Sequence, residues 1–268
     1  MTDPITSTSN PRIKDLVRLR NRRHRDRSGR FVIEGYRELD RAARAGITIE
    51  TVYACPDLYL GGNEPGLVER LMGAGAEVIE VSEAPFRKAS YRDRPEGLLA
   101  VAPHFAVDLD RVPLDGEPLV LVAESIEKPG NLGTMLRTAE AAGADGVIAS
   151  DPTTDVFNPN VVRASLGTLF QVPVAVGGTP EVADHLRRAG VRTLASSPDA
   201  DTPLWEADMT GPVALVVGSE QYGLSDEWMN AADEVITIPM PGAVDSMNAA
   251  MAAGILLFEA VRQRSRES

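Results

Sequence analysis

Polar side chains that could bind and orient a ligand lie at three places in the second half of the chain. They occupy the segments PGNLGTMLRTA (129–139), VVGSEQYGLS (216–225) and IPMPGAVDSMNAAMAAGILLFE (238–259), and they are Asn131, Arg137, Glu220, Ser246 and Asn248. A guanidinium can stabilise a developing negative charge, while amide, carboxylate and hydroxyl groups can orient a polar ligand. Ser246 and Asn248 also stand where the last helix is expected to begin. Taken alone, such residues are more often helix caps than site residues.

The predicted secondary structure brings these segments to one edge of a sheet. From about residue 119 onwards, buried apolar strands alternate with helices, which is typical of a mostly parallel sheet covered on both faces. Three predicted strand ends carry candidate residues: Val217 is followed by Gly218 and Glu220, Ile238 by Met240, and a third strand by Ser196. Because ligands bind beyond the carboxyl ends of parallel strands, we expect these loops to surround one small ligand.

Together the three segments resemble the motifs of the SpoU (TrmH-like) family of RNA ribose 2′-O-methyltransferases, within the SPOUT superfamily. The resemblance extends from about Leu119 to Glu259 and keeps the order and spacing of the motifs. It implies a C-terminal domain threaded into a trefoil knot, which general topology rules would not predict. It also implies S-adenosylmethionine held in a bent form and a homodimer formed through the knotted domain. The small residues Ala249, Ala250, Ala252 and Ala253 would permit close helix packing in that dimer.

The resemblance also assigns roles to individual positions. The implied cofactor-binding residues are Leu194, Ser196, Gly218, Ile238, Met240, Ser246 and Met247. The implied catalytic residues are Asn131, Arg137, Glu220, Ser246 and Asn248. Arg137 is the one nearest the attacking oxygen, and because a guanidinium keeps its charge it is expected to stabilise the alkoxide or bind a phosphate rather than act as a base. Glu220 is expected to hydrogen-bond Arg137 or Asn131.

Other kinds of site have less support. A Rossmann-type enzyme needs a G-x-G-x-x-G turn after its first strand, and PGNLGT offers only two glycines. Cys55 is the single cysteine and the three histidines are scattered, so neither a disulfide framework nor a metal site is expected. No signal peptide and no long apolar run is evident, and we expect a cytoplasmic protein.

The first part of the chain predicts a smaller α/β domain. Predicted strands at 30–33, 51–54, 77–81 and 98–102 alternate with helices. The FVIEG segment and the later EGLLAVA strand resemble the L30e-like substrate-binding domain that precedes many SpoU domains. The expected organisation is therefore a first domain at 1–103, a proline-rich linker at 104–117 and the methyltransferase domain at 118–268.

Charge is distributed unevenly along the chain. The whole protein carries −12, but residues 1–30 contain nine Arg or Lys and three Asp, a net charge of +6 that leaves −18 for the rest. We expect a basic helical arm that contacts RNA phosphates through solvent-exposed arginines, with one more contact from the segment VVRASLGTLF. The predicted RNA-binding residues are Arg20, Arg22, Arg23, Arg25 and Arg163. The alternative is a solvated charged helix without a partner.

The expected function is S-adenosylmethionine-dependent 2′-O-methylation of RNA, with 23S ribosomal RNA as the substrate that an L30e-like domain favours. Relatives of this kind include the avilamycin and thiostrepton resistance enzymes of antibiotic producers, so resistance to a ribosome-targeting antibiotic is one role that the resemblance suggests. Two alternatives stay open. One is a transfer RNA 2′-O-methyltransferase, and the other is a catalytically silent protein that binds ribosomal RNA.

Overall fold

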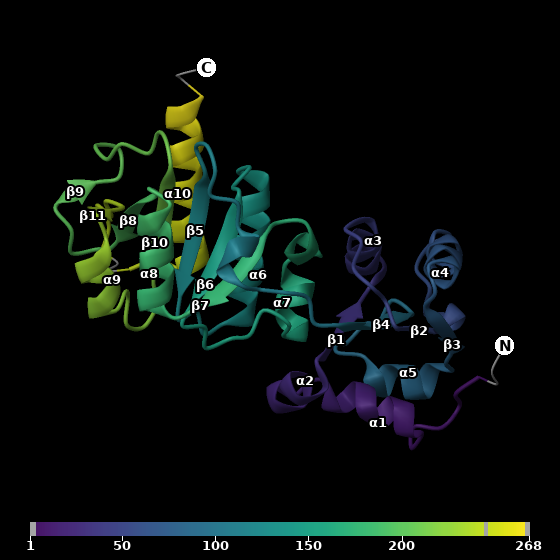
Figure 1. The fold of residues 1–268 in the computed structure, drawn as a ribbon. Helices are drawn as coiled ribbons and strands as arrows, with labels where there is room; N and C mark the ends of the chain where they lie inside the picture. Colours follow the sequence, from purple (N-terminus) through teal and green to yellow (C-terminus); the bar gives the residue numbers. More distant parts are fainter. Residues whose placement is uncertain (1–3, 244–245, 266–268) are drawn as a thin grey trace. The chain divides into compact units, whose positions relative to one another are not determined.

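The computed structural model describes residues 4–243 and 246–265. The chain forms two compact units, and Figure 1 shows the course of the chain through both. One unit consists of the residues up to Phe105 together with Asp155–Gln171, and the other consists of Ala106–Thr154 with the residues from Val172 onwards. The sequence places 155–171 in the second domain, whereas its packing groups this segment with the first unit.

The first unit is built on a mixed sheet with the strand order β1 (Arg30–Glu34), β4 (Leu98–Pro103), β2 (Thr51–Ala54) and β3 (Glu77–Glu80). Only the β2–β3 pair is parallel among the described pairs of this sheet. The helices are α1 (Pro11–Arg18), α2 (Arg22–Ser28), α3 (Tyr36–Arg44), α4 (Glu64–Gly73) and α5 (Glu83–Ala89). The expected single basic arm is therefore two helices, α1 and α2.

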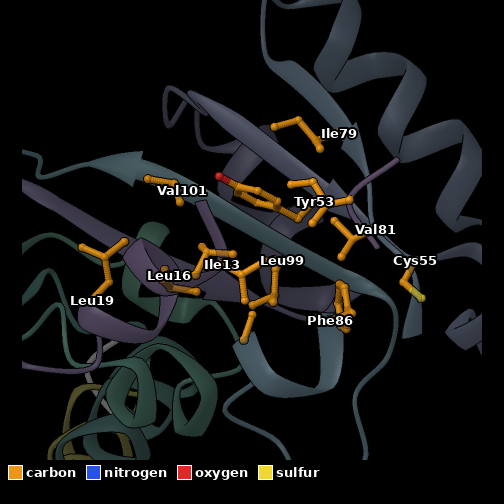
Figure 2. Packing of buried hydrophobic residues seen from close by; sticks show 13 residues of the cluster. Ile13, Leu16, Leu19, Tyr53, Cys55, Ile79, Val81, Phe86, Leu99 and Val101 are labelled. Atoms are coloured by element: carbon orange, nitrogen blue, oxygen red, sulfur yellow. The ribbon is translucent and has the colours of Figure 1, made fainter. Parts of the chain in front are cut away.

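The hydrophobic core of this unit forms where α1 and α5 pack on one face of the sheet. Ile13 and Leu16 of α1 and Phe86 of α5 meet Tyr53 and Leu99 of the strands, as Figure 2 shows. Asn10 caps α1 by accepting from the Arg12 N–H at 2.9 Å, and Pro11 occupies the first turn. The apolar stripe predicted beneath the arginines of α1 is thus the face that this helix buries.

Aromatic packing explains why the segment 155–171 joins the first unit. The ring centroids of Phe157 and Phe31 of β1 are 5.0 Å apart. The Phe157 ring also stacks on His104, with 4.0 Å between the ring centroids and an angle of 6° between the planes. The short helix α7 (Pro159–Ala164) and the 3₁₀ turn Thr168–Phe170 follow. Gly167 adopts a φ of +83° and packs so closely on α3 that a methyl group there would lie 3.1 Å from the Cα of Glu38.

The second unit is built on a parallel sheet with the order β7 (Val174–Gly177), β6 (Gly146–Ser150), β5 (Leu119–Glu124), β10 (Val213–Val217), β8 (Arg192–Ser196), β11 (Glu234–Thr237) and β9 (Thr202–Pro203). Every described pairing in this sheet is parallel. The continuous apolar runs of β5 and β10 are buried on both faces, which is why they lack the alternation of a half-exposed strand. The trefoil knot stays a prediction.

Helices cover both faces of this sheet. α6 (Pro129–Ala141) and α10 (Ala249–Arg264) pack together, with α10 on β5 and β10 and α6 on β6. α8 (Thr179–Arg188) and α9 (Asp226–Ala231) also pack together, with α8 on β6 and β8. Val182, Leu186 and Trp228 of the latter two helices form a core with Val120 and Val122 of β5.

The segment predicted as a linker is partly structural. Leu109 and Val112 are buried in the core of the second unit, and the carbonyl of Val107 accepts a hydrogen bond from the Val176 N–H at 2.7 Å. The prolines and aspartates of this segment interrupt the apolar pattern, so the sequence did not indicate that Leu109 and Val112 are buried. Within the described residues, no helix has the length and apolar character that crossing a bilayer requires, and no group of His, Cys, Asp and Glu side chains could hold a metal ion.

Candidate active site

A cavity of about 430 Å³ lies at the carboxyl ends of β8, β10 and β11. Three loops that follow these strands contribute to its lining, as expected for a parallel sheet. Six of the seven predicted cofactor-binding residues line it: Ser196, Gly218, Ile238, Met240, Ser246 and Met247. Ala249 and Ala252 of α10 and Met229 of α9 add apolar surface.

Leu194 is the predicted cofactor-binding residue that does not line the cavity. It lies in β8 between β10 and β11, and its side chain is fully buried. The side chain of Leu194 lies within the paired part of the strand and the cavity begins at Ser196. The role expected of these residues was largely a backbone one, so cofactor binding by Leu194 stays a prediction.

The loop after β10 is a tight turn. Ser219 and Gly223 exchange two backbone hydrogen bonds of 3.0 Å, and Gly223 adopts a φ of +67°. A methyl group on Gly218 would lie 2.2 Å from the backbone of Gly223, so only glycine allows this closure. The turn places Glu220 and Tyr222 in the cavity lining.

The start of α10 brings two predicted catalytic residues together. Asn248, not Ser246, is the N-cap, and its Oδ1 accepts from the N–H groups of Ala250 at 3.0 Å and Met251 at 3.3 Å. The helix expected from Ser246 therefore begins three residues later, and Ser246 lines the cavity instead. The Nδ2 of Asn248 donates to Oδ1 of Asn131 on α6 at 3.1 Å.

Two buried polar atoms of the candidate residues have no hydrogen-bond partner among the described residues. They are Nδ2 of Asn131, a donor, and Oε1 of Glu220, an acceptor. The expected bond from Glu220 to Arg137 or Asn131 is absent within the described part of the chain, because Glu220 lies in the turn after β10 and contributes to the cavity lining. An unpaired buried polar group costs about 1–3 kcal/mol, so such groups commonly mark a place where a ligand supplies the partner.

A buried carboxylate that sequence reasoning missed holds the same turn in place. Glu124, at the end of β5, is 3% exposed and accepts from the Ser225 N–H at 2.9 Å through Oε2. Its Oε1 accepts from the Thr179 hydroxyl at 3.3 Å, and Thr179 in turn contacts the Ser150 hydroxyl at 2.7 Å. A charged residue that closes an apolar strand, LVLVAE, was the available signal.

The comparisons with known proteins agree with this geometry. Residues 118–258 match the model of the SpoU rRNA methylase family, and residues 10–100 match that of the MRM3-like substrate binding domain. The chain belongs to the SpoU rRNA methylase family. The two matches together cover most of this SpoU protein, with a separate model for each part.

Relatives of this SpoU protein are similar over nearly the whole chain. It is 34% identical to the 23S rRNA (uridine(2479)-2′-O)-methyltransferase of Streptomyces viridochromogenes, over 92% of this chain and 87% of the relative. The crystal structure of an AdoMet-bound rRNA methyltransferase from Sinorhizobium meliloti superposes with a TM-score of 0.89 at 32% identity, covering 97% of both chains. The AdoMet complex of the SpoU methyltransferase AviRb from Streptomyces viridochromogenes gives a TM-score of 0.85 at 33% identity, covering 96% of this chain and all of that one (100%).

Arg137 is an exposed residue of α6, six residues after Asn131. No described residue forms a hydrogen bond or ion pair with its side chain, and it is not part of the cavity lining. The structure of this SpoU protein therefore joins Asn131 with Asn248 and places Ser246 and Glu220 in one cavity, while the guanidinium of Arg137 stays available to a ligand.

Among the predicted RNA-binding arginines, Arg25 is a correction. Its side chain is 1% exposed, pairs with Asp155 at 2.6 Å and donates to the carbonyls of Leu19 and Arg20 at 2.8 Å each. It therefore ties α2 to the segment 155–171 within the first unit and cannot reach RNA. No local pattern in the sequence indicates its distant partner.

The other predicted RNA-binding arginines are exposed, and they differ in their contacts. Arg22 pairs with Asp26 at 3.7 Å, whereas Arg23 forms no hydrogen bond or ion pair with any described residue. Arg20 donates to the carbonyls of Lys88 and Ala89 at 3.0 and 3.2 Å. Arg163 is exposed on α7, in the segment that belongs to the first unit.

The contacts of Arg20 form part of a basic hollow on the first unit. Its guanidinium lies 5.4 Å from the centre of the Tyr91 ring. The hollow has a volume of about 480 Å³ and is lined by Arg20, Arg87, Lys88, Ser90, Tyr91, Arg92, Asp93 and Pro95. Cations outnumber the single carboxylate here, so the hollow favours an anionic ligand.

Proposed function

We propose that this SpoU protein transfers a methyl group from S-adenosylmethionine to a ribose 2′-hydroxyl of RNA, and that its substrate is 23S ribosomal RNA. The observation that carries the proposal is that Ser246 and Glu220 line one cavity at the carboxyl ends of parallel strands, while Asn248, between two residues of that lining, is hydrogen-bonded to Asn131. The named activity of the Streptomyces viridochromogenes relative supports the substrate.

The cavity suits S-adenosylmethionine in size and chemistry. Its volume of about 430 Å³ falls within the range usual for cofactor sites, about 300–1,000 Å³. Ile238, Met240 and Met247 offer apolar surface for a purine ring, and Ser196, Ser246 and Glu220 offer polar partners. AdoMet-bound structures of two similar proteins support this assignment.

The reaction needs little beyond positioning and charge stabilisation. The bound cofactor would supply a methyl group that is already electrophilic. Asn131 and Asn248 orient the ribose, since the unpaired Nδ2 of Asn131 can donate to an oxygen of the nucleotide. Arg137 stabilises the oxygen as its proton passes to water or to a phosphate of the RNA, or it holds the adjacent phosphate, because a guanidinium remains charged at any working pH.

RNA contacts in this proposal come from the first unit, which matches a substrate binding domain. Arg22, Arg23 and Arg163 are exposed cations, and Arg20, Arg87 and Lys88 surround the basic hollow. Phosphate groups would be attracted to both, with an affinity that falls as salt rises.

A homodimer is also part of the proposal, but through a different face of α10 from the one expected. Ala249, Ala250, Ala252 and Ala253 are buried inside the unit, where α10 packs on α6 and the sheet. Met251, Ile255 and Phe258 are instead 64%, 38% and 49% exposed. Their spacing of four and three residues puts them on one side of the helix, and an apolar stripe of this kind suits a second copy of the same surface.

The activity can be tested with RNA from cells that lack the protein. Purified protein is incubated with S-adenosylmethionine labelled in its methyl group and, separately, with 23S rRNA, 16S rRNA and transfer RNA from such cells. We expect label in 23S rRNA alone, recovered as a 2′-O-methyl nucleoside after digestion. Label in transfer RNA alone would refute the substrate, and label on a base would refute the reaction. Cofactor binding without any transfer would favour the catalytically silent alternative. A role in resistance to a ribosome-targeting antibiotic requires that 23S rRNA be the substrate, and a cytoplasmic location is part of the same proposal.

A further inference from the structure

Tyr222 is an exposed aromatic side chain in the lining of the active-site cavity. Its exposed fraction is 75%, although a tyrosine ring typically buries about 150–250 Å² in a folded protein. Folding gains little from a ring left in solvent, so packing within the unit does not account for it. Because the Tyr222 ring lies beside a ligand cavity, we expect it to contact a ligand.

The backbone around Tyr222 is fixed without the help of its ring. Ser219 and Gly223 exchange two hydrogen bonds across the turn, and Oγ of Ser219 accepts from the Tyr222 N–H at 3.2 Å. Glu124 holds the end of the same loop through the Ser225 N–H. The backbone that carries the ring is therefore already ordered before a ligand binds, which lowers the entropy cost of a contact between the ring and the ligand.

The surroundings of Tyr222 do not suit a phosphate group. The described cavity lining that includes Tyr222 contains no Lys or Arg, and it contains the carboxylates of Asp199 and Glu220. An RNA strand that reaches this turn would be repelled through its phosphates. The uncharged face of a base can still be accommodated, because aromatic side chains stack on any base.

We propose that Tyr222 stacks on an unpaired base of the RNA substrate and so helps to seat the nucleotide that is methylated. The inference rests on the proposed function and adds a positioning residue that the family motifs do not assign. The cations of the first unit and Arg137 provide attraction for the strand, and Tyr222 provides a contact for a base taken out of its helix.

The test compares the KM for 23S rRNA, from cells lacking the protein, among three variants. Tyr222→Leu keeps an apolar side chain but loses the aromatic face, and we expect the KM to rise about 5- to 150-fold, the factor that base stacking usually contributes. Tyr222→Phe should stay within about twofold of the wild type, since the ring remains. Trp205→Leu is the matched control, because Trp205 is 57% exposed in the same unit but does not line the cavity.

The cofactor affinity of the variants and the activity of the wild type separate this inference from the proposed function. The dissociation constant for S-adenosylmethionine, measured by calorimetry, should be unchanged in all variants. A Tyr222→Leu protein with a wild-type KM would overturn the stacking role. An equal loss of cofactor affinity would overturn it too, by assigning the ring to the cofactor. If the wild type methylates no RNA, the proposed function fails as well, whereas a normal wild type with an indifferent Tyr222 removes the inference alone.

Discussion

Asn248 donates a hydrogen bond from its Nδ2 to Oδ1 of Asn131 across 3.1 Å, while its own Oδ1 caps α10. One side chain thus supports the fold with its oxygen and the candidate site with its nitrogen. An aspartate at this position would cap the helix as well as asparagine does, but it would have no amide to donate.

The variant Asn248→Asp therefore separates the two roles. We expect its free energy of unfolding to stay within about 0.5 kcal/mol of the wild type. The Asn131 amide would have to turn to donate to the new carboxylate, so its Nδ2 would no longer be available to substrate, and methyl transfer should fall at least about tenfold. Asn10→Ala is the control: it removes the cap of α1, costs about 0.5–2 kcal/mol and should leave the turnover number unchanged. Urea unfolding and steady-state kinetics provide both measurements, and an Asn248→Asp enzyme with normal turnover would contradict the role.

Arg137 should affect the chemical step and spare the cofactor. Replacing it with alanine is expected to lower kcat about 10²- to 10³-fold, as the loss of a group that stabilises an oxyanion does, without changing the dissociation constant for S-adenosylmethionine. Glu140→Ala is the matched control, because Glu140 is an exposed residue of the same helix. Near-normal turnover in the Arg137→Ala protein would remove Arg137 from the mechanism.

How far the sequence predicted this structure depends on the range of the interactions. Local patterns were sufficient for most elements: β2 was predicted with its observed bounds, and the apolar runs of β5 and β10 identified buried parallel strands. The predicted ends of the strands then indicated the position of the cavity, since the loops that follow parallel strands meet at one edge of the sheet. The start of α10 was misjudged because both Ser246 and Asn248 are good capping residues and sequence alone does not choose between them.

Partners that are distant in sequence were the ones missed. Arg25 was predicted to contact RNA because it stands among other arginines, yet its partner Asp155 lies 130 residues away. The segment around Phe157 was placed with the second domain because nothing local reveals its packing on Phe31. Glu124 escaped notice for the same reason, since the Ser225 N–H that it accepts from lies 101 residues further along.

Glu124 should link stability to cofactor affinity. Glu124→Ala leaves the Ser225 N–H and the Thr179 hydroxyl without their acceptor, and we expect a loss of about 1–3 kcal/mol in the free energy of unfolding. The turn at 218–225 also loses its anchor, so the affinity for S-adenosylmethionine should fall. Thr179→Val is the control, because it removes only the hydroxyl side of the network. That variant should lose stability and keep its cofactor affinity, and an equal effect of both variants on binding would refute the anchoring role.

Arg25 and Arg23 are neighbours in sequence that should behave in opposite ways. Arg25→Ala leaves Asp155 with little exposure and no cation, and breaking a buried pair of this kind costs about 3–5 kcal/mol of stability. Arg23→Ala should leave the unfolding curve unchanged but weaken binding to 23S rRNA and reduce its dependence on salt concentration. Filter binding across a salt series and urea unfolding test both. If Arg23→Ala binds RNA with the salt dependence of the wild type, α2 is a solvated helix that does not contact RNA.

The exposed stripe of α10 predicts the oligomeric state. If Met251, Ile255 and Phe258 meet the same residues of a second copy, the wild type should sediment at about twice its chain mass of 28.7 kDa. The double variant Ile255→Asp with Phe258→Asp puts charges on this face, and since burying unpaired charges is costly it should sediment as a monomer. Leu60→Asp is the matched control, because Leu60 is 76% exposed on the first unit and its change should leave the mass as in the wild type.

Because all of these side chains are solvent-exposed in the single chain, the variants should unfold at the same urea concentration when the monomers are compared. A wild type that sediments at 28.7 kDa across the micromolar range, or a double variant that remains at twice that mass, would rule out this face of α10 as the interface.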